Sequence, residues 1–383
     1  MNTERIDTVV IGGGQAGLAA GYYLSKQGRE FVILDAGQRV GAAWRSRWDS
    51  LRLFTPTSLN SLPGMAFPAP RGHLPTKDEM ADYLEAYAAR FELPVQLGVK
   101  VDELVRDGDR YLITAGTQRW EARHVIVATG TYSTPWVPPF ASQLDPAITQ
   151  LHSVAYRNPD QLRAGAVLVV GAGNSGAEIA LDLASRHLTW LAGRDTGHIP
   201  ITVGGLAYQI GSFAFHTMMK RLTVDTWLGR RLVARAKAWG EGGHPVVRVK
   251  PEALVAAGVQ RVPRVTGVSG GRPLLEDQRV LDVANVVWCT GFVRDDHWIK
   301  LPVFDANGDP IHHRGVVRTE PGLYFSGLPN QSTLLSGIVA GAGPDAKYIV
   351  TQIARRARAV GPAHKARWAQ GAGIPKSIGA PEP

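Results

Sequence analysis

The sequence contains the same glycine-rich turn twice, and this repeat restricts the folds that the chain can adopt. The stretch VVIGGGQAGLAA covers residues 9–20, and VLVVGAGNSGAEIA covers residues 167–180. Each is a G-x-G-x-x-G motif that follows an apolar run and precedes an alanine-rich helical pattern. The motif glycines recur at a spacing of 159 positions, with Gly12, Gly14 and Gly17 matching Gly171, Gly173 and Gly176.

A turn of this kind joins a strand tightly to a helix and lets backbone N–H groups at the helix start meet a pyrophosphate. Because both copies have the strand before and the helix after, we interpret them as dinucleotide-binding turns rather than as plain tight turns. The neighbouring residues of the turns are then expected to contact the ligands: Gln15 and Ala16 in the first copy, Asn174 and Ser175 in the second.

The second strand of each copy is expected to end on a residue that meets the adenosine ribose. In the first copy FVILDA places Asp35 there, which suits the free ribose hydroxyls of FAD. At the same offset the second copy has Arg194, and a cation there favours the 2′-phosphate of NADPH. The alternative is that Arg194 is an ordinary loop arginine. The opposite charges predict FAD in the first copy and NADPH in the second.

A second repeat indicates how two domains share the chain. HVIVATG at 124–130 and NVVWCTG at 285–291 are apolar runs that end in Thr-Gly, and each is interpreted as a late strand of one domain. The predicted fold class is α/β, with two Rossmann-like dinucleotide-binding domains and the NADPH domain inserted in the FAD domain. We expect the FAD domain at 1–155 and 286–360, the NADPH domain at 160–285, and a tail at 361–383.

Composition narrows the functional classes. The single cysteine, Cys289, excludes a disulfide framework and any CxxC dithiol. The net charge is +9, but the basic residues are spread along the chain, so we expect no nucleic-acid partner. The start does not resemble a signal peptide, and no run of about 18 apolar residues occurs. We therefore expect a cytoplasmic protein without a membrane span, and we expect no metal site.

Together with the two turns, further segments resemble class B flavoprotein monooxygenases, most closely the short bacterial and plant indole-pyruvate-monooxygenase-like members. These segments are GAAWRSRWDSLRLFTPTSLNSLPGMAFP at 41–68, ATGTYSTPWVP at 128–138, LHSVAYRNP at 151–159 and GLYFSGLPNQST at 322–333. The family fingerprint F-x-G-x-x-x-H-S-x-x-Y is matched at three positions and differs at the first two, where Pro146 and Ile148 stand; the matches are His152, Ser153 and Tyr156.

The resemblance implies a glutathione-reductase-like flavoprotein that uses FAD, NADPH and O2 and forms a C4a-hydroperoxyflavin. The implied chemistry requires no side chain that acts as a general acid or base. Two residues are expected to act by positioning: Trp44 beside the flavin ring, and His152 in the linker between the domains. For Arg45 and Arg47 two alternatives are open: they bind a cofactor phosphate, or they pair with Asp49. The expected FAD contacts extend to Trp44, Arg45, Ala128, Thr129, Gly130, Gly327, Gln331 and Ser336.

The segment 200–250 does not fit a strand–helix repeat. Its apolar residues, with Met218 and Met219 beside aromatic residues, are compatible with a substrate-side helical cap, a membrane-surface element, a dimer face or core packing. The cap ranks first because the segment falls inside the NADPH domain, and a homodimer is left open.

The leading functional hypothesis is an NADPH-dependent FAD monooxygenase acting on a small organic substrate with O2. Oxygenation of nitrogen or sulfur, or oxidative decarboxylation, is favoured over Baeyer–Villiger insertion, whose complete fingerprint is absent. The alternatives are a reductase that passes electrons to a partner protein or a quinone without inserting oxygen, and a flavin-bound sensor with little turnover.

Overall fold

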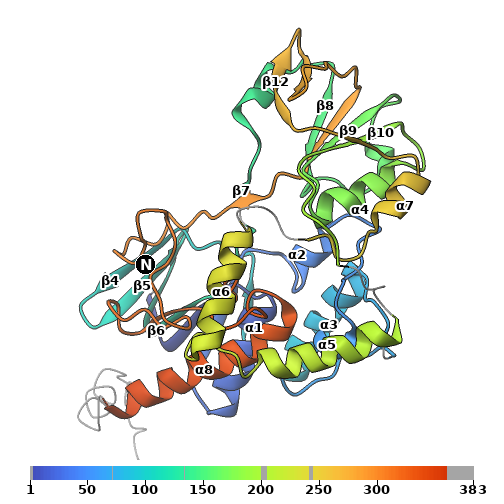
Figure 1. Ribbon diagram of the computed structural model, residues 1–383. Helices are drawn as coiled ribbons and strands as arrows, with labels where there is room; N and C mark the ends of the chain where they lie inside the picture. The colour runs from blue at the N-terminus through green and yellow to red at the C-terminus, as the bar shows by residue number, and fades with distance from the viewer. Residues whose placement is uncertain (1–2, 71, 133, 200–204, 241–244, 360–383) are drawn as a thin grey trace, which may run out of the picture.

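The computed structural model describes residues 3–70, 72–132, 134–199, 205–240 and 245–359, which form two α/β lobes (Figure 1). The expected tail at 361–383 and parts of the 200–250 segment lie outside the described residues. Each lobe is built around a sheet with parallel strands, as the alternation of apolar strands and helices predicts. The predicted fold class is confirmed.

The first lobe contains a seven-stranded sheet in the order β3-β2-β1-β6-β5-β4, with β16 also paired to β6. The pairs among β1, β2, β3, β6 and β16 are parallel, whereas β4 and β5 extend the sheet as antiparallel strands. The strands are β1 Thr3–Ile11, β2 Phe31–Asp35, β3 Val95–Leu97, β4 Glu103–Asp107, β5 Arg110–Ala115, β6 Gln118–Val127 and β16 Leu323–Phe325.

Alternating side chains of β1 divide the core of this lobe between the two faces of the sheet. Val10 packs with α1, α3 and α8, whereas Val9 and Ile11 pack with β4, β5 and the segment 298–304. The helices of this lobe are α1 Gln15–Lys26, α2 Ala42–Arg45, η1 Thr57–Leu59, α3 Lys77–Arg90 and α8 Val339–Ala359.

The second lobe contains a five-stranded parallel sheet in the order β11-β10-β9-β14-β8. Helices α4 and α7 cover one face, and the β12–β13 hairpin with η2 covers the other. The elements are η2 Pro139–Gln143, β8 Thr149–His152, η3 Pro159–Gln161, β9 Val167–Val170, α4 Asn174–Leu183, β10 Thr189–Ala192, α7 Pro251–Ala256, β11 Gln260–Val262, β12 Val265–Ser269, β13 Arg272–Leu275 and β14 Asn285–Trp288.

The chain passes between the lobes at a two-stranded ribbon (Figure 1), in which β7 Thr134–Pro135 pairs antiparallel with β15 Phe292–Val293. This corrects the expected boundaries at residues 155 and 286. β8 and β14 are hydrogen-bonded to each other and complete the second sheet, so both strands belong to the second lobe. The four-residue strand β8 is too short to show its partner by hydrophobic pattern alone.

Two helices, α5 Leu206–Met219 and α6 Trp227–Gly240, form an insertion in the sequence of the second lobe. Its stems meet where the Ile199 N–H donates to the Val246 carbonyl oxygen at 3.0 Å. The helices themselves lie against the first lobe (Figure 1), where the Tyr208 hydroxyl donates to the Phe54 carbonyl oxygen. Their role as a substrate-side cap stays a prediction.

His124 is a buried histidine of β6 in the first lobe, and it is 3% exposed. Its Nδ1 atom has no hydrogen-bond partner among the described residues. Burial lowers its pKa to about 4, and the cations Arg29 and Arg356 also lower it, against the opposing charge of Asp7. The folded protein therefore holds this imidazole neutral under mildly acidic conditions.

We predict that His124→Gln reduces the pH dependence of stability between pH 6.5 and about 4. In this range the unfolded histidine takes up a proton and the folded one does not, so the free energy of unfolding falls as the pH falls. Removing the histidine should abolish up to about 3 kcal/mol of this change. Urea unfolding at several pH values measures it, with the exposed His198→Gln as control. An unchanged slope in His124→Gln would contradict a neutral buried imidazole.

Candidate dinucleotide sites

The first glycine turn joins β1 to α1, and its packing requires residues without side chains. Gly12 has φ +108°, and a Cβ there would lie 2.5 Å from the carbonyl oxygen of Ala128. A Cβ on Gly17 would lie 1.8 Å from the carbonyl oxygen of Gly12. Such distances are sterically forbidden, so α1 packs directly on the backbone of the turn.

The second turn repeats these contacts between β9 and α4. Gly171 also has φ +108°, and its Cβ would lie 2.2 Å from the carbonyl oxygen of Cys289. A Cβ on Gly176 would lie 1.7 Å from the carbonyl oxygen of Gly171. The two copies therefore share the same backbone geometry. In each, the first glycine also contacts the residue that follows a later strand of its sheet, β6 in the first lobe and β14 in the second.

Both turns fit a dinucleotide pyrophosphate. The N-cap residues Gly14 and Gly173 offer no side-chain cap to the first N–H groups of α1 and α4. A Cβ on either glycine would meet nothing within 4 Å, so an approaching ligand finds no steric obstacle there. Uncapped N–H groups at an accessible helix start are the arrangement that binds phosphate.

Asp35 ends β2 beside the first turn, as predicted. Its carboxylate accepts hydrogen bonds from the backbone N–H groups of Gly13 at 2.6 Å and Gly37 at 2.7 Å. Gln15 and Ala16 form the first residues of α1, half-buried and buried respectively. Two backbone donors thus hold the carboxylate beside the first turn, a position that would suit it to bind the ribose of a dinucleotide.

Arg194 lies two residues beyond the end of β10 and is exposed beside the second turn. The preceding Gly193 carbonyl oxygen accepts a hydrogen bond from Arg261 Nη2 of β11 at 3.1 Å. The strand pairing therefore brings a second guanidinium next to Arg194, which sequence spacing did not reveal. Arg261 could have been found only by predicting that β11 lies next to β10 in the sheet.

Asn174 differs from expectation because its side chain is engaged within the protein. Its Nδ2 donates to the Pro245 carbonyl oxygen at 3.2 Å, and its Oδ1 accepts from the Val247 N–H at 2.8 Å. The side chain therefore ties the second turn to the stem of the α5–α6 insertion instead of pointing to a ligand. Ser175, the next residue of α4, is half-buried.

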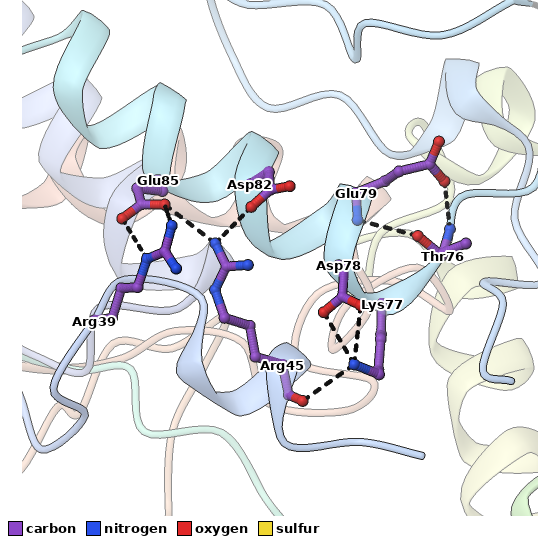
Figure 2. Close-up of polar contacts among 8 residues, drawn as sticks. All are labelled: Arg39, Arg45, Thr76, Lys77, Asp78, Glu79, Asp82 and Glu85. Carbon is purple, nitrogen blue, oxygen red and sulfur yellow. Dashed lines mark hydrogen bonds and ion pairs between the residues drawn. The ribbon is translucent and has the colours of Figure 1, made fainter. Parts of the chain in front are cut away.

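Ion pairs hold the short helix α2 against α3, as Figure 2 shows. Arg45 Nη2 lies 2.7 Å from Asp82 Oδ1 and 3.1 Å from Glu85 Oε2. The expected alternative of an Arg45 pair with Asp49 is therefore wrong. Its neighbour Trp44 is partly buried and packs against the first-lobe core, so both side chains are directed by α3 and the core.

A capping box fixes the start of α3 (Figure 2). The Glu79 N–H donates to Thr76 Oγ1 at 3.1 Å, and the Thr76 N–H donates to Glu79 Oε2 at 2.7 Å. The adjacent Lys77 is 7% exposed, and its Nζ donates to Asp78 at 3.0 Å and to the Arg45 carbonyl oxygen at 3.4 Å. Lys77 at the helix start thereby holds the backbone at the end of α2.

His152 lies where the chain crosses between the lobes. Its Nε2 contacts the Gly291 carbonyl oxygen at 3.0 Å, and the Val154 N–H donates to Nδ1 at 3.2 Å. A carbonyl only accepts, so Nε2 carries the proton of a neutral ring. Burial lowers the pKa of His152. Its ring packs edge-on against Phe292 of β15, and Arg47 also lies against this phenyl ring, 5.6 Å from its centroid. This environment suits a positioning residue, and it also places Arg47 away from an Asp49 pair.

The residues that follow β6 and β16 converge on the first turn. Ala128 is the contact of Gly12, and it is followed by Thr129, which is exposed, and Gly130, which has φ +75°. A Cβ on Gly327 would lie 2.8 Å from Cβ of Ala16, so the loop after β16 approaches the start of α1 closely. Three segments distant in sequence thus form one surface around the first turn.

Gln331 and Ser336 lie in that loop, but part of their bonding is internal. Gln331 Oε1 accepts from the Leu328 N–H at 3.2 Å, while its buried Nε2 has no partner among the described residues. Ser336 Oγ accepts from the N–H groups of Ser332 at 3.0 Å and Thr333 at 3.2 Å. The Gln331 Nε2 atom is buried beside Gly315, and the Ser336 oxygen stabilises the loop.

Sequence reasoning missed Asp345 of α8, which is 2% exposed below this loop. Its Oδ2 atom has no hydrogen-bond partner among the described residues. Burial raises its pKa, and Ser332 and Ser336 counteract this shift. A buried acid with an unsatisfied oxygen is invisible in sequence, because Asp near a helix start is ordinarily an exposed cap.

Among the described residues, no group of three or more His, Cys, Asp or Glu side chains is placed to hold a metal ion. None of the described helices combines the length and the apolar character that a membrane crossing requires.

Comparison with known proteins identifies relatives along most of the chain. A family model described as pyridine nucleotide-disulphide oxidoreductase matches residues 9–196. An uncharacterized CzcO-like oxidoreductase of Geobacillus kaustophilus is 38% identical over 356 residues, which cover 91% of this chain and 98% of that protein. The probable indole-3-pyruvate monooxygenase YUCCA9 of Arabidopsis thaliana is 28% identical over 385 residues, with coverages of 90% and 88%.

A solved structure extends the comparison to three dimensions. The flavin-containing monooxygenase from Stenotrophomonas maltophilia superimposes with a TM-score of 0.73 at 30% sequence identity. The match covers 93% of this chain and 100% of that one. Sequence and structure thus point to the same group of proteins.

We predict that Gly176→Ala destabilises the second lobe by about 2 kcal/mol or more, because the new methyl group meets a backbone oxygen that cannot move away. Gly173→Ala is the matched control: its backbone is extended, a Cβ meets nothing within 4 Å, and the expected loss is below about 1 kcal/mol. Guanidinium unfolding without added nucleotide measures both. Equal losses in the two variants would contradict the close contact.

Proposed function

The chain belongs to the pyridine nucleotide-disulphide oxidoreductase family, and we propose that it is an NADPH-dependent FAD monooxygenase acting on a small organic substrate. Its resemblance to flavin monooxygenases is confirmed by its relatives. The observation that carries the proposal is the pair of matching glycine turns, one beside Asp35 and the other beside Arg194.

We assign FAD to the first lobe. The uncapped start of α1 would bind the pyrophosphate and Asp35 the ribose, and the loop that contains Gly327 and Gln331 would lie beside the ligand at the first turn. When bound, FAD would supply the redox chemistry by accepting electrons from NADPH and passing them to O2. The proposed contacts are Gly12, Gly14, Gln15, Ala16, Gly17, Asp35, Ala128, Thr129, Gly130, Gly327 and Gln331.

We assign NADPH to the second lobe. The start of α4 would bind the pyrophosphate, and Arg194 would pair with the 2′-phosphate. Asn174 would act indirectly, because its side chain holds the backbone of the 245–247 segment against the second turn. The proposed contacts are Gly171, Gly173, Ser175, Gly176 and Arg194.

The protein's own contribution is placement rather than acid–base or thiol chemistry. His152 is neutral and fully hydrogen-bonded at the crossing between the lobes, which suits it to fix the nicotinamide lobe relative to the flavin lobe. Exchange with a disulfide through a dithiol needs two cysteines, and this chain has only Cys289. Burial also raises the pKa of that thiol, which disfavours the reactive thiolate.

The test of this function measures flavin reduction by NADPH and incorporation of oxygen into the product in separate steps. We expect NADPH to bleach the purified yellow protein anaerobically, and O2 then to produce a persistent spectrum that is neither oxidised nor reduced flavin. With soft amines, sulfides or aryl-pyruvate acids, isotopically labelled O2 should enter the product. Immediate return of oxidised flavin, with electrons recovered in a quinone and no labelled product, would instead support a reductase.

We predict that Arg194→Ala lowers the NADPH over NADH preference about 10- to 150-fold, which corresponds to a lost charge-assisted contact of about 1.5–3 kcal/mol. The ratio of kcat/KM for flavin reduction by the two nucleotides measures this. Arg272→Ala, an exposed arginine on β13 of the same lobe, should leave the ratio unchanged. An unchanged ratio in Arg194→Ala would remove this residue from the site.

A further inference from the structure

The α5–α6 insertion carries exposed apolar side chains that do not pack into the core on either face of the first-lobe sheet. On α5 these side chains are 44–64% exposed, and they are Ile210, Phe213, Phe215 and Met218. At the start of α6, Trp227 is 66% exposed. Isolated exposed hydrophobic residues are common, but a row of them along one helix marks an interaction surface.

Ile210, Phe213 and Met218 share one face of α5 with Ala214 and Thr217, because these five positions follow spacings of three and four, whereas Phe215 lies on another side of the helix. This face comprises Ile210, Phe213, Ala214, Thr217 and Met218, and we call it the α5 outer face. The Thr217 hydroxyl donates to the Phe213 carbonyl oxygen at 2.9 Å, so it adds no unsatisfied polar group. Figure 1 shows α5 along an outer edge of the molecule.

The side of α5 that contacts the first lobe is the more polar one. It presents Tyr208, which donates to the Phe54 carbonyl oxygen, together with the half-buried Ser212 and His216. Met219 is the fully buried apolar residue at the end of this side. An amphipathic helix normally turns its apolar stripe to its own core, so the reversed orientation indicates that the outer face has an external partner.

Charge identifies the kind of partner. Between residues 205 and 237 the sequence has a single acidic residue, Asp225, which pairs with His313 at 2.8 Å and Arg314 at 2.6 Å. The same stretch carries six cationic residues, which are Lys220, Arg221, Arg230, Arg231, Arg235 and Lys237. Lys220 and Arg221 directly follow the α5 outer face, and the exposed Arg230 and Arg231 lie in the first part of α6. This region therefore combines exposed apolar groups with excess positive charge.

We propose that the α5 outer face and the start of α6 dock on the surface of an anionic lipid membrane. The apolar side chains of α5 enter the boundary between headgroups and acyl chains, and the cations contact the headgroups. Trp227, with Arg231 5.6 Å from its ring centroid, has the aromatic and cationic pairing suited to this boundary.

Length determines how the helix lies. The 14 residues of α5 extend about 21 Å at 1.5 Å per residue, short of the roughly 30 Å of a hydrocarbon core. The helix therefore lies in the plane of the membrane surface rather than across it. A second copy of the chain is the weaker candidate partner, because two-fold pairing of this surface would bring its cations toward each other.

The surface is already formed in the folded protein, so docking does not require the helices to fold. The Val224 N–H between α5 and α6 donates to the Ser332 carbonyl oxygen at 2.8 Å. Together with the Asp225 ion pairs, this contact fixes the turn to the first lobe. A preformed surface retains more of its contact energy as affinity.

Vesicle sedimentation of the purified yellow protein tests the proposal. Vesicles of equal parts phosphatidylcholine and phosphatidylglycerol should bind the protein about tenfold more tightly than vesicles of phosphatidylcholine alone, and added salt should weaken this binding. The double variants Phe213→Ser/Met218→Ser and Arg221→Gln/Arg231→Gln should each bind the mixed vesicles about tenfold more weakly.

Val255→Ser is the matched control, because Val255 is 72% exposed on α7 of the second lobe and should leave vesicle binding unchanged. Flavin content and the midpoint of thermal unfolding show that each variant is folded. Absence of binding to the mixed vesicles, or equal binding to both compositions, would overturn the proposal. So would a dimer in light scattering that Phe213→Ser/Met218→Ser dissociates without any change in vesicle binding.

Discussion

Both lobes depend on one steric constraint, the direct contact between a helix start and the backbone of a glycine turn. Gly17 and Gly176 leave no room for a side chain against the preceding turn, and Gly12 and Gly171 leave none against a later strand. Because the turn touches the later strand, it also fixes where β6 and β14 end. The N-cap glycines of the same two motifs, Gly14 and Gly173, leave the first N–H groups of α1 and α4 without side-chain caps, so one motif serves both the packing and the proposed nucleotide binding.

The rest of the architecture positions these two turns relative to each other. The β7–β15 ribbon carries both chain crossings, and His152 contacts Gly291 and Phe292 beside it. On the first-lobe side, α3 holds α2 through Arg45, and on the second-lobe side Asn174 holds the insertion stem. The groups expected to act on the ligands are thus supported by neighbours that are distant in sequence.

Sequence was sufficient for features whose signal is local. The turns, the charges of Asp35 and Arg194, and the two-domain α/β fold follow from motifs and apolar runs shorter than about 15 residues. Sequence reasoning failed where a residue interacts with one that is distant in the chain. Arg45, for example, pairs with Asp82 rather than with the nearby Asp49. The boundaries at 155 and 286 failed for the same reason, because a strand of four residues has no periodicity that identifies its neighbour.

The insertion has a mechanical consequence for the arrangement of the lobes. Its stems leave the second lobe at Ile199 and Val246, while its turn is anchored to the first lobe through Asp225. The insertion thus connects the two lobes in addition to the β7–β15 ribbon. Any rotation of the second lobe relative to the first must therefore strain or break this connection, and Asn174 places its attachment directly at the second glycine turn.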